Sequence, residues 1–561
     1  MKKNKNKSIK LLPHLFYTSN ESWWLVGFSM LLAGGIIVEP QLICSSLIKG
    51  QLSDMWLYWS AAIGSAFSVS FFAHLWQKVP VKTENEFLYF RFSGMGAKVL
   101  HQFRSLYLGF LIIPFIISFS LLAFSKIAGS ILKIDTPYAI LLLSILLVFL
   151  TFFNSLKIRL RMDFVLFIIF IILFGILIIS LFSITGGINH LSKTVITSNI
   201  NFTIIPSIGS KTFNAFIVYV AIQWWSASLL DYPDINGQKL MATNGSKNLV
   251  KSIFLPSISI ILFRVVLFSL PFMAVVYGYT NGCSDSELAL TLLFTKALPT
   301  WMLILVLVFF MIPFLSVVQN LQNWGGSLLV ENFYKYSINQ NAEEKKLKKI
   351  GLLAMVYIII ASGFIAFYSS SLVGITKYLF AITAGVGPVF MLRWYWWRIN
   401  AWSQLSAMLA SLVFPVVLDW LVNTNSCIHI VMSELETNLN MDYYPIKIII
   451  LTIAVCSTWL AVTFLTPPTD EAILRKFVTT IRPGGFWKKY GGVGKSFSKM
   501  RTLAWIVQTT NGFLVYFMFW NFLIGNYILF ISLLLIFCFS FFLAYRLIQK
   551  ANTLYEIELI K

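Results

Sequence analysis

Long apolar stretches separated by short loops, with basic residues gathered in every second loop, constrain this chain more than any other feature. Fourteen stretches are long enough to cross a bilayer, since a helical span needs about 20 apolar residues. If the N-terminus is cytoplasmic, the loops on the cytoplasmic side hold 34 of the 43 Lys and Arg residues. Basic residues in short loops resist translocation, so this asymmetry predicts an all-α polytopic membrane protein and its orientation.

Composition excludes an ordinary soluble enzyme. The 561 residues are 58% apolar and only 12% charged, whereas soluble chains average about 25% charged residues. The net charge of +21 suits loops that face the anionic inner leaflet of a lipid bilayer. No basic face alternates with stacking aromatic residues, so we do not expect a nucleic-acid partner. No soluble domain interrupts the apolar pattern, and we expect no enzymatic activity.

The spans divide the chain into five expected regions. The expected spans are 23–45, 55–77, 104–127, 137–154, 163–186, 212–231, 253–278, 299–320, 350–368, 372–393, 402–422, 446–466, 503–523 and 527–547. The expected regions are a cytoplasmic N-terminus (1–22), a first repeat of helices 1–5 (23–186), a second repeat of helices 6–10 (212–393), additional C-terminal helices (402–547) and a cytoplasmic tail (548–561).

Two spans contain residues that interrupt helices. The first contains Ala33-Gly34-Gly35 followed by Glu39-Pro40, and the sixth ends at Asp231-Tyr232-Pro233. Non-helical backbone at membrane depth is tolerated only where it lines a cavity or is buried in protein. Two interrupted helices, five spans apart and running in opposite directions, favour an inverted repeat of five plus five helices. The alternative is that Gly and Pro are simply common in membrane helices.

A family resemblance rests on five blocks in the chain. The loop after the second span reads Thr83-Glu-Asn-Glu86-Phe87-Leu-Tyr-Phe-Arg91-Phe92-Ser-Gly. It resembles the T-x-x-EF-x-x-x-RFSG signature of the sodium:solute symporter family, which includes sodium-coupled glucose, proline and sialic acid transporters. Four further blocks resemble that family's first, sixth, eighth and tenth core helices or the loops after them: Ser22 to Met30, Ala221 to Trp225, Gln322 to Tyr334, and Arg393 to Trp402.

The resemblance implies a leucine-transporter-like fold with two inverted five-helix repeats and extra C-terminal helices. It also implies alternating access in a bacterial inner membrane, a small organic solute as substrate and sodium as the driving ion. Most relatives carry one further helix before the core, and only 22 residues precede Trp23 here. We therefore expect that helix to be missing and the N-terminus to be cytoplasmic, in agreement with the distribution of charge.

The family's common sodium site uses oxygens of the first and eighth core helices. The matching first-helix positions are Ala33 and Ile36, and the matching eighth-helix positions are Pro313, Ser316 and Val317. Ser316 keeps its hydroxyl, but Val317 stands where relatives have Ser or Thr, and its methyl groups cannot coordinate a cation. Water, substrate, Gln319 or Asn320 could complete the site, or the site could be lost. The polar run through Gln322 could instead join helices to one another.

Three ionisable residues lie within expected spans. Glu39 could contact substrate or an ion, could accept a proton, or could be hydrated at the outer end of its span. Asp163 matches a family Asp near the inner sodium exit and could also be a helix N-cap. Arg264 matches a family Arg, and a lone Arg there is expected to pair with a carboxylate or to line water. We expect Asp163 and Arg264 to act in gating.

Aromatic residues complete the candidate substrate site. Trp224, Trp225 and Ser226 lie on the sixth span where relatives touch substrate, and we add Trp59 and Glu39 to this set. Trp rings can stack on sugars or hold cations, although packing against neighbouring helices is an equally good interpretation.

Among the five cysteines, Cys283 and Cys427 both fall in outward loops. They could pair in a disulfide or remain free thiols, because a sequence does not show their distance.

The leading functional hypothesis is cation-coupled symport, with sodium as the expected ion. Three departures from the family pattern keep a non-transporting sensor or partner subunit as an alternative: the lost hydroxyl at Val317, the missing first helix, and the loop after the sixth span, where the glycine-rich segment of relatives is reduced to Gly237. A third hypothesis is proton-coupled transport through Glu39.

Overall fold

The structure is a computed structural model in which the chain folds as a bundle of helices. It describes residues 21–33, 37–49, 52–76, 78–81, 85–153, 155–187, 189–190, 192–193, 204–227, 285–492 and 499–560, and the single residues 239, 243, 251, 270 and 273. Within these ranges the only β-type pairings are two isolated bridges, Glu21 with Thr243 and Trp396 with Phe486. The prediction of an all-α protein is therefore confirmed.

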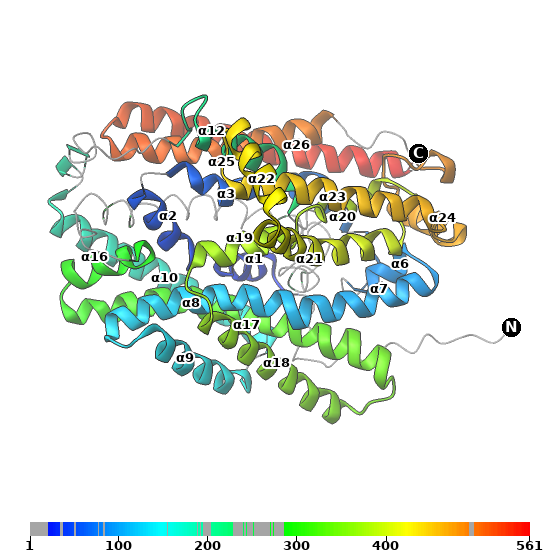
Figure 1. The fold of residues 1–561 in the computed structure, drawn as a ribbon, viewed down its shortest axis with the longest axis horizontal. Helices are drawn as coiled ribbons and strands as arrows, with labels where there is room; N and C mark the ends of the chain where they lie inside the picture. The colour runs from blue at the N-terminus through cyan, green and yellow to red at the C-terminus, as the bar shows by residue number, and fades with distance from the viewer. Residues whose placement is uncertain are drawn as a thin grey trace.

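The N-terminal half of the bundle contains the first five expected spans. Its helices are α1 (Trp23–Leu32), α2 (Glu39–Ile48), η1 (Leu52–Met55), α3 (Trp56–Trp59), α4 (Ala61–Phe71), α5 (Ala73–Trp76), α6 (Glu86–Arg91), α7 (Gly94–Leu106), η2 (Tyr107–Ile112), α8 (Ile113–Leu132), α9 (Thr136–Thr151) and α10 (Leu156–Ile184). The long helix α8 runs along the long axis of the molecule, and α9 is inclined to it (Figure 1).

The middle of the chain contains the sixth to tenth expected spans. Its helices are α12 (Lys211–Val218), η3 (Tyr219–Gln223), α13 (Trp224–Ser226), η4 (Ser286–Leu288), α16 (Ala289–Ala297), α17 (Thr300–Ser327), η5 (Leu328–Ile338), α18 (Glu344–Phe367), α19 (Leu372–Ala381) and α20 (Gly387–Tyr395). Most of the seventh expected span, 253–278, lies outside the described residues.

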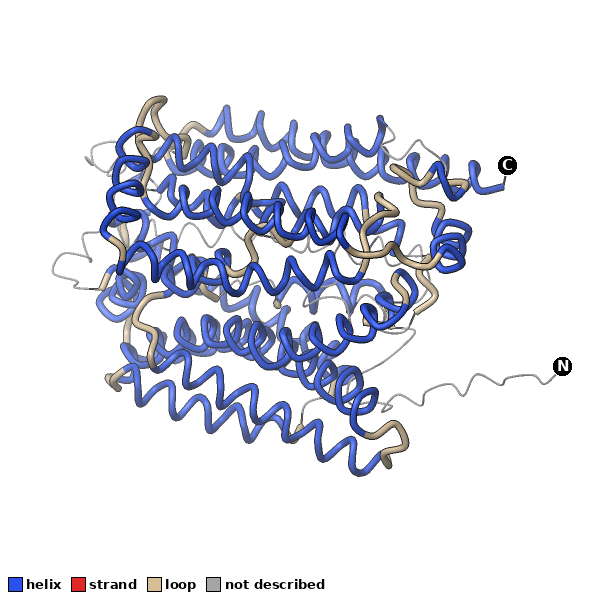
Figure 2. The backbone as a smooth tube through the Cα atoms, turned by 45° about the vertical axis from the view of Figure 1, so that its right-hand side comes forward, coloured by secondary structure: helices blue, strands red, loops and turns tan. Residues whose placement is uncertain are grey.

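The C-terminal part adds helices to this arrangement. They are α21 (Ala401–Thr424), α22 (Ser426–Asn438), α23 (Tyr443–Leu465), α24 (Glu471–Ile481), η6 (Lys488–Tyr490), α25 (Lys499–Leu523) and α26 (Tyr527–Ile560). The last two pack against each other along their length, and α25 also packs against α4. In the tube view most helices run side by side, joined by short loops at the two ends of the bundle (Figure 2).

Seven helical segments of the described residues are long and apolar enough to cross a membrane. They are Gly94–Leu132, Leu156–Ile184, Thr300–Ile338, Glu344–Phe367, Ala401–Thr424, Tyr443–Leu465 and Tyr527–Tyr555. The first, second and tenth expected spans are divided into shorter helices, and the described part of the sixth is a continuous helical run that ends at Ser226. The breaks in the first and tenth spans and the end of the sixth shape the candidate site. A multi-pass membrane protein is thereby confirmed.

Two details of the predicted spans are wrong. The tenth span was expected to run unbroken over 372–393, but α19 ends at Ala381 and α20 begins only at Gly387. The fifth was expected to begin at Asp163 with that residue as a possible N-cap, but α10 begins at Leu156 with Ser155 as its N-cap. Hydropathy placed the start of the fifth span too late, because Arg159 and Arg161 interrupt the apolar run. Helical residues can nevertheless carry charge within a span where a partner is close.

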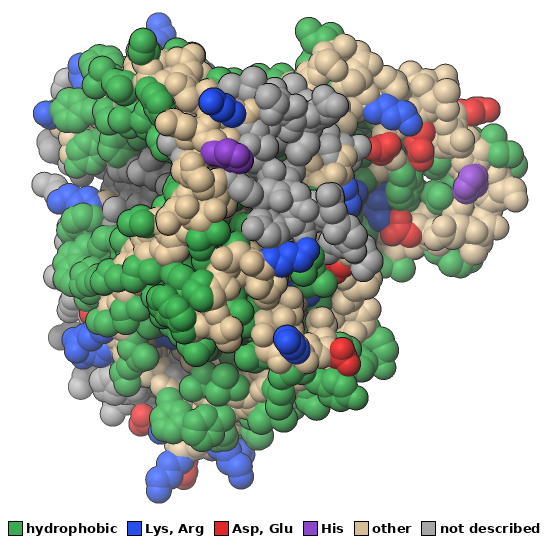
Figure 3. Space-filling model, turned by 90° about the vertical axis from the view of Figure 1, so that its left-hand side faces the viewer, with side chains coloured by type: hydrophobic (Ala, Val, Ile, Leu, Met, Phe, Trp, Pro, Cys, Tyr) green, Lys and Arg blue, Asp and Glu red, His purple; other side chains and the backbone are tan. Residues whose placement is uncertain are grey.

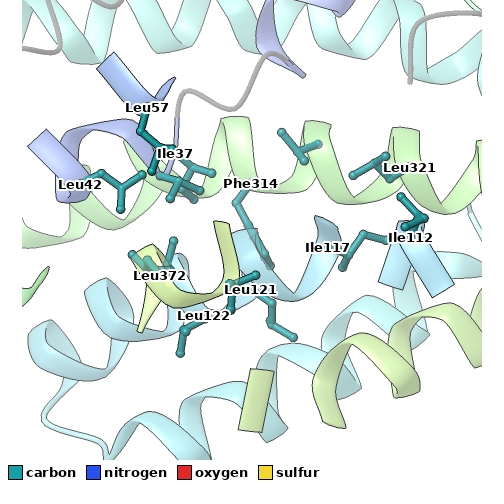
Figure 4. Packing of buried hydrophobic residues seen from close by; sticks show 14 of the residues in the cluster. Ile37, Leu42, Leu57, Ile112, Ile117, Leu121, Leu122, Phe314, Leu321 and Leu372 are labelled. Atoms are coloured by element: carbon teal, nitrogen blue, oxygen red, sulfur yellow. The ribbon is translucent and has the colours of Figure 1, made fainter. Parts of the chain in front are cut away.

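A large hydrophobic core joins the broken helices to the long ones. Figure 4 shows side chains of α2, α8, α17 and α19 converging on one region. The labelled members are Ile37, Leu42, Leu57, Ile112, Ile117, Leu121, Leu122, Phe314, Leu321 and Leu372, all of them buried. Because protein interiors are close-packed, this region holds the helix ends around the candidate site in defined positions.

The two ends of the bundle differ in charge. The basic segments around α6 and α24 lie at one end of the bundle, and α16 lies at the opposite end (Figure 1). At the α16 end, acidic side chains gather on a projecting part of the surface, although single Lys and Arg side chains also lie there (Figure 3). This separation is what the positive-inside rule requires. A cytoplasmic location for α6 and α24 stays a prediction.

The E-F-x-x-x-R-F-S-G segment, Glu86 to Gly94, joins α6 to the end of α20, and we call its contacts through Arg91 the Arg91 clasp. Arg91 is fully buried and donates from Nε to the Arg393 carbonyl at 2.6 Å and from Nη2 to the carbonyls of Trp396 and Ile399 at 3.1 Å each. Phe87 stacks on Trp394 with ring centroids 4.6 Å apart. Burial first, and the nearby Arg393 second, lower the pKa of the Arg91 guanidinium to about 9. The guanidinium is therefore charged at neutral pH and satisfies carbonyls in and after the last turn of α20.

Candidate functional site: broken helices beside a buried polar cluster

The first expected span is broken near its middle, as its Gly and Pro residues predicted. Helix α1 ends at Leu32 with Ala33 as its C-cap, and α2 begins at Glu39 with Pro40 in its first turn. The last carbonyls of a helix lack intrahelical partners, and the helix dipole places partial negative charge there. The C-terminal end of α1 can thus offer oxygen atoms to a cation. Of the two expected ligands, Ile36 lies outside the described residues.

Helix α17 supplies the opposite side of the candidate ion site and packs against α1. Pro313 lies inside α17, where its ring removes one backbone hydrogen bond and so leaves a carbonyl without its usual helical partner. Ser316 is fully buried and Val317 nearly so. The carbonyl and hydroxyl of Ser316 accept hydrogen bonds from Asn320 Nδ2 at 2.7 and 3.3 Å. The oxygen atoms that α17 can offer to a cation here are therefore the Ser316 hydroxyl and helix carbonyls. The side chain of Val317 carries only methyl groups and offers none.

Glu39 lies at the positive end of the dipole of α2, where a carboxylate is favoured. Its side chain is only 7% exposed. This burial argues against the interpretation of Glu39 as an outer-end carboxylate surrounded by water. Contact with substrate, ion or proton stays a prediction.

A buried polar cluster lies one helical turn before the end of α1. Asp163 of α10 is fully buried and accepts hydrogen bonds from the Ser29 hydroxyl and from Asn320 Nδ2 at 3.2 Å. Arg159 forms an ion pair with Asp163, with Nη2 2.7 Å from Oδ1, and donates from Nη1 to Gln319 Oε1. The carboxylate thus joins α1, α10 and α17. Its expected role near an inner ion path stays a prediction.

Lys239 also reaches the end of α1. Its ammonium donates to the Ser29 carbonyl at 2.9 Å, and the side chain is only 1% exposed. That carbonyl also accepts the Ala33 N–H at 3.2 Å. A cation at the C-terminal end of a helix is favoured by the helix dipole. The contact of Lys239 with α1 could not be foreseen from the sequence, because Lys239 and Ser29 are 210 positions apart.

The helix of the sixth span ends beside the break in the tenth span. The α13 helix ends at Ser226, whose hydroxyl accepts the Gly385 N–H at 2.9 Å and lies 2.5 Å from the Thr452 hydroxyl. The Thr383 hydroxyl donates to the Ala227 carbonyl at 3.0 Å. Gly385 has a φ of 80°, a conformation that glycine adopts without strain. Ser226 is thus placed where the helix of the sixth span ends beside the break in the tenth, and the Gly385-Val-Gly387-Pro388 run was the overlooked signal for that break.

The tryptophans of the expected substrate site pack against the C-terminal helices. Trp59 is fully buried and stacks on Tyr516 with centroids 4.2 Å apart. Trp224 lies 5.6 Å from Phe67 and 5.7 Å from Trp505, measured between ring centroids. Packing between helices accounts for these contacts, and a role in binding solute stays a prediction. The Trp225 indole donates to the Ala221 carbonyl at 2.6 Å within its own helix.

The remaining sequence expectations divide into two groups. Gln322 joins helices, since its Nε2 donates to the Thr151 hydroxyl at 2.6 Å and to the Met355 carbonyl at 3.2 Å. Three candidates lie outside the described residues: Asp231, Arg264 and Cys283. The partner of Arg264 and a disulfide between Cys283 and Cys427 therefore stay predictions.

A second charged cluster, missed in the sequence, lies near α16. Lys126 of α8 forms ion pairs with Asp285 at 2.6 Å and Glu287 at 2.7 Å. Glu287 also accepts the N–H of Leu372 at 2.9 Å, at the start of α19. The cluster thus fastens one half of the broken tenth span to α8. A single Lys inside the third span, with an acidic loop at 285–287, was the available signal.

Helices that break in mid-bundle beside buried oxygen atoms define a class of protein: a membrane carrier of the leucine-transporter-like fold. A solved structure titled "Substrate-bound outward-open state of a Na+-coupled sialic acid symporter reveals a novel Na+-site" matches with a TM-score of 0.56 and 14% identity, over 80% of this chain and 91% of that one. A likeness at this identity shows the fold, and the expected leucine-transporter-like architecture is confirmed.

Sequence comparison places the chain within that class. The model of the sodium:solute symporter family matches residues 43–411. The chain is also similar to the high-affinity proline transporter PutP of Bacillus subtilis (strain 168), with 29% identity over 93 residues, which are 16% of this chain and 20% of that transporter. The chain belongs to the sodium:solute symporter family, and the resemblance drawn from its motifs is confirmed.

Proposed function

We propose that this protein carries a small organic solute across the bacterial inner membrane by alternating access, coupled to a cation with sodium as the driving ion. The observation that carries the proposal is the break between α1 and α2, because α1 packs against α17, the helix that carries the buried Ser316. In transporters of this kind, unwound carbonyls and half-helix C-terminal ends coordinate the driving ion. The solute would lie near Ser226, where the helix of the sixth span ends beside the break in the tenth.

Coupling follows from differential binding. An ion that binds the outward-open state better than the inward-open state shifts the population toward the form that accepts solute from outside. The ion also carries charge inward, and the membrane potential contributes about 2.3 kcal/mol per charge per 100 mV. Sugars, amino acids, carboxylates and sialic acid are the solute classes to screen. Proline, glucose and sialic acid are practical first probes.

The test is uptake of these radiolabelled solutes into proteoliposomes, with an inward sodium gradient or with choline in place of sodium. We expect uptake that requires sodium, and we expect Ser316→Ala to raise the half-saturating sodium concentration about tenfold, as loss of about 1.4 kcal/mol would. Ser362→Ala is the matched control, because Ser362 is equally buried and its hydroxyl bonds only the Ile358 carbonyl of its own helix at 2.6 Å. Sodium-independent uptake, or equal effects of the two substitutions, would contradict sodium coupling at Ser316.

Proton coupling is the second candidate, favoured by the burial of Glu39 at a helix break. In that case Glu39→Gln abolishes uptake driven by a pH gradient, whereas Ser316→Ala leaves it unchanged. If no solute is taken up under either gradient while solutes still raise the melting temperature, a sensor or partner subunit becomes the better interpretation, since a ligand stabilises the protein that binds it.

A further inference from the structure

The polar cluster around Asp163 has the composition of a site for a hard cation. Its oxygen atoms are those of the Asp163 carboxylate and of the Gln319 side-chain carbonyl. The hydroxyl and carbonyl of Ser316 are linked to Asp163 by Asn320, whose Nδ2 donates to all three groups. Carboxylate, carbonyl and hydroxyl oxygens are the ligands that alkali and alkaline-earth cations prefer. Two helices, α10 and α17, bring them together in the interior of the bundle.

In this chain a side chain already occupies that cluster. The Arg159 guanidinium pairs with Asp163 Oδ1 at 2.7 Å and donates to Gln319, and Arg159 is only 4% exposed. The two residues are four positions apart on α10, the spacing that places side chains on the same helix face. Arg is suited to such a place, because its planar fork binds two oxygen acceptors at once and keeps its charge when buried.

The balance of charge then disfavours a free ion. One carboxylate is neutralised by one guanidinium, and the ammonium of Lys239 lies on the carbonyl of Ser29, whose hydroxyl is bonded to Asp163. An added sodium ion would face the Arg159 guanidinium in a low-dielectric interior, where like charges repel strongly. It would also compete with Arg159 for the same oxygen atoms.

We propose that Arg159 is a resident cation that fills the Asp163 cluster, so that no free alkali ion binds there. The binding part of this proposal does not depend on the proposed function, and only its consequence for transport does. That consequence is that any coupling ion would use the end of α1 and Ser316, not the Asp163 cluster. The guanidinium stays attached to α10 through the transport cycle, so it can hold α1 and α17 together without being released with the solute.

The test is to remove the guanidinium and ask whether sodium takes its place. Purified wild-type protein and Arg159→Met, which keeps most of the side-chain bulk, are titrated with sodium chloride against choline chloride at constant ionic strength. We expect Arg159→Met to gain a saturable, sodium-dependent rise in melting temperature and one additional ²²Na⁺ ion bound per chain. Adding Asp163→Asn to that variant should remove the gain. Arg159→Lys should show no gain, because its ammonium still supplies a positive charge.

Arg161→Met is the matched control, since Arg161 lies on the same helix two residues away and is exposed; it should respond to sodium as the wild type does. If Arg159→Met does not fold, wild type and Asp163→Asn are compared instead, and the proposal requires equal ²²Na⁺ binding. The proposal is overturned if Asp163→Asn lowers sodium binding while Arg159 is present, or if Arg159→Met binds no additional sodium. Because these readouts measure binding, a failure of sodium-driven uptake would leave the result at Arg159 unchanged.

Discussion

At the scale of single residues, buried arginines stabilise this protein because they donate hydrogen bonds to oxygen atoms that have no partner within the helices. Arg91 donates to one backbone carbonyl in the last turn of α20 and to two carbonyls after that helix, and it lies 5.0 Å from the centre of the Trp487 ring. A buried group of this kind costs little while its partners are present and costs much when one partner is removed, because the remaining groups are then buried without hydrogen bonds.

Replacing Arg91 tests this view directly. Arg91→Met should destabilise the protein by about 3–5 kcal/mol, seen as a large fall in melting temperature in detergent. Arg475→Met should change stability by no more than about 0.5 kcal/mol, because both Arg475 and its partner Glu471 are 60% exposed. Similar melting temperatures for the two variants would show that the Arg91 clasp is not needed for stability.

At the scale of elements, the breaks in the helices shape the candidate site more than the continuous helices do. Apolar runs placed most of the helices, but the division of the tenth span depends on Gly385, whose positive φ bends the chain toward Ser226. Helix α24 also follows from pattern, since Leu474, Phe477, Val478 and Ile481 recur at helical spacing on one buried face. Helix α24 lies between the expected spans 446–466 and 503–523, in a loop that the sequence predictions describe only as basic and cytoplasmic.

The break at Gly385 can be tested with a single added methyl group. A Cβ on Gly385 would lie 2.6 Å from Val455 Cβ, and the φ of 80° would be strained. Gly385→Ala should therefore destabilise the protein by about 1–3 kcal/mol and abolish any uptake that the wild type shows.

Gly374→Ala is the control for this change. Gly374 lies within α19, and an added Cβ there would come no closer than 3.6 Å to another side chain. It should be neutral or slightly stabilising, because Ala favours helices more than Gly does. Unchanged melting temperature and uptake in Gly385→Ala would show that the break tolerates a side chain.

At the scale of the whole molecule, orientation is set by charge, since basic loops at one end of the bundle resist translocation. The α24 helix lies at the basic end, and Cys427 lies exposed at the start of α22 in an expected outward loop. The predicted topology therefore places Cys427 outside the cell and α24 inside.

Cysteine labelling in intact spheroplasts checks this orientation. A variant with Cys427 as its only cysteine should react with a membrane-impermeant maleimide added from outside. A cysteine-free variant carrying Thr479→Cys, at an exposed position of α24, should react only after the membrane is broken. The reverse pattern would invert the assignment of every loop.

The sequence alone determined the membrane class, the family, the break in the first span and the predicted orientation, because hydropathy, glycine and proline content and loop charge are local properties of the chain. Only the tertiary structure decided what surrounds Asp163. Arg159 lies one turn from Asp163 on α10, whereas Ser29, Asn320 and Lys239 come from three other segments, and their meeting around Asp163 depends on how the helices pack. A carboxylate in a span predicts some positive partner, but whether that partner is an ion from solution or an arginine of the same chain is a matter of distance and charge that folding settles.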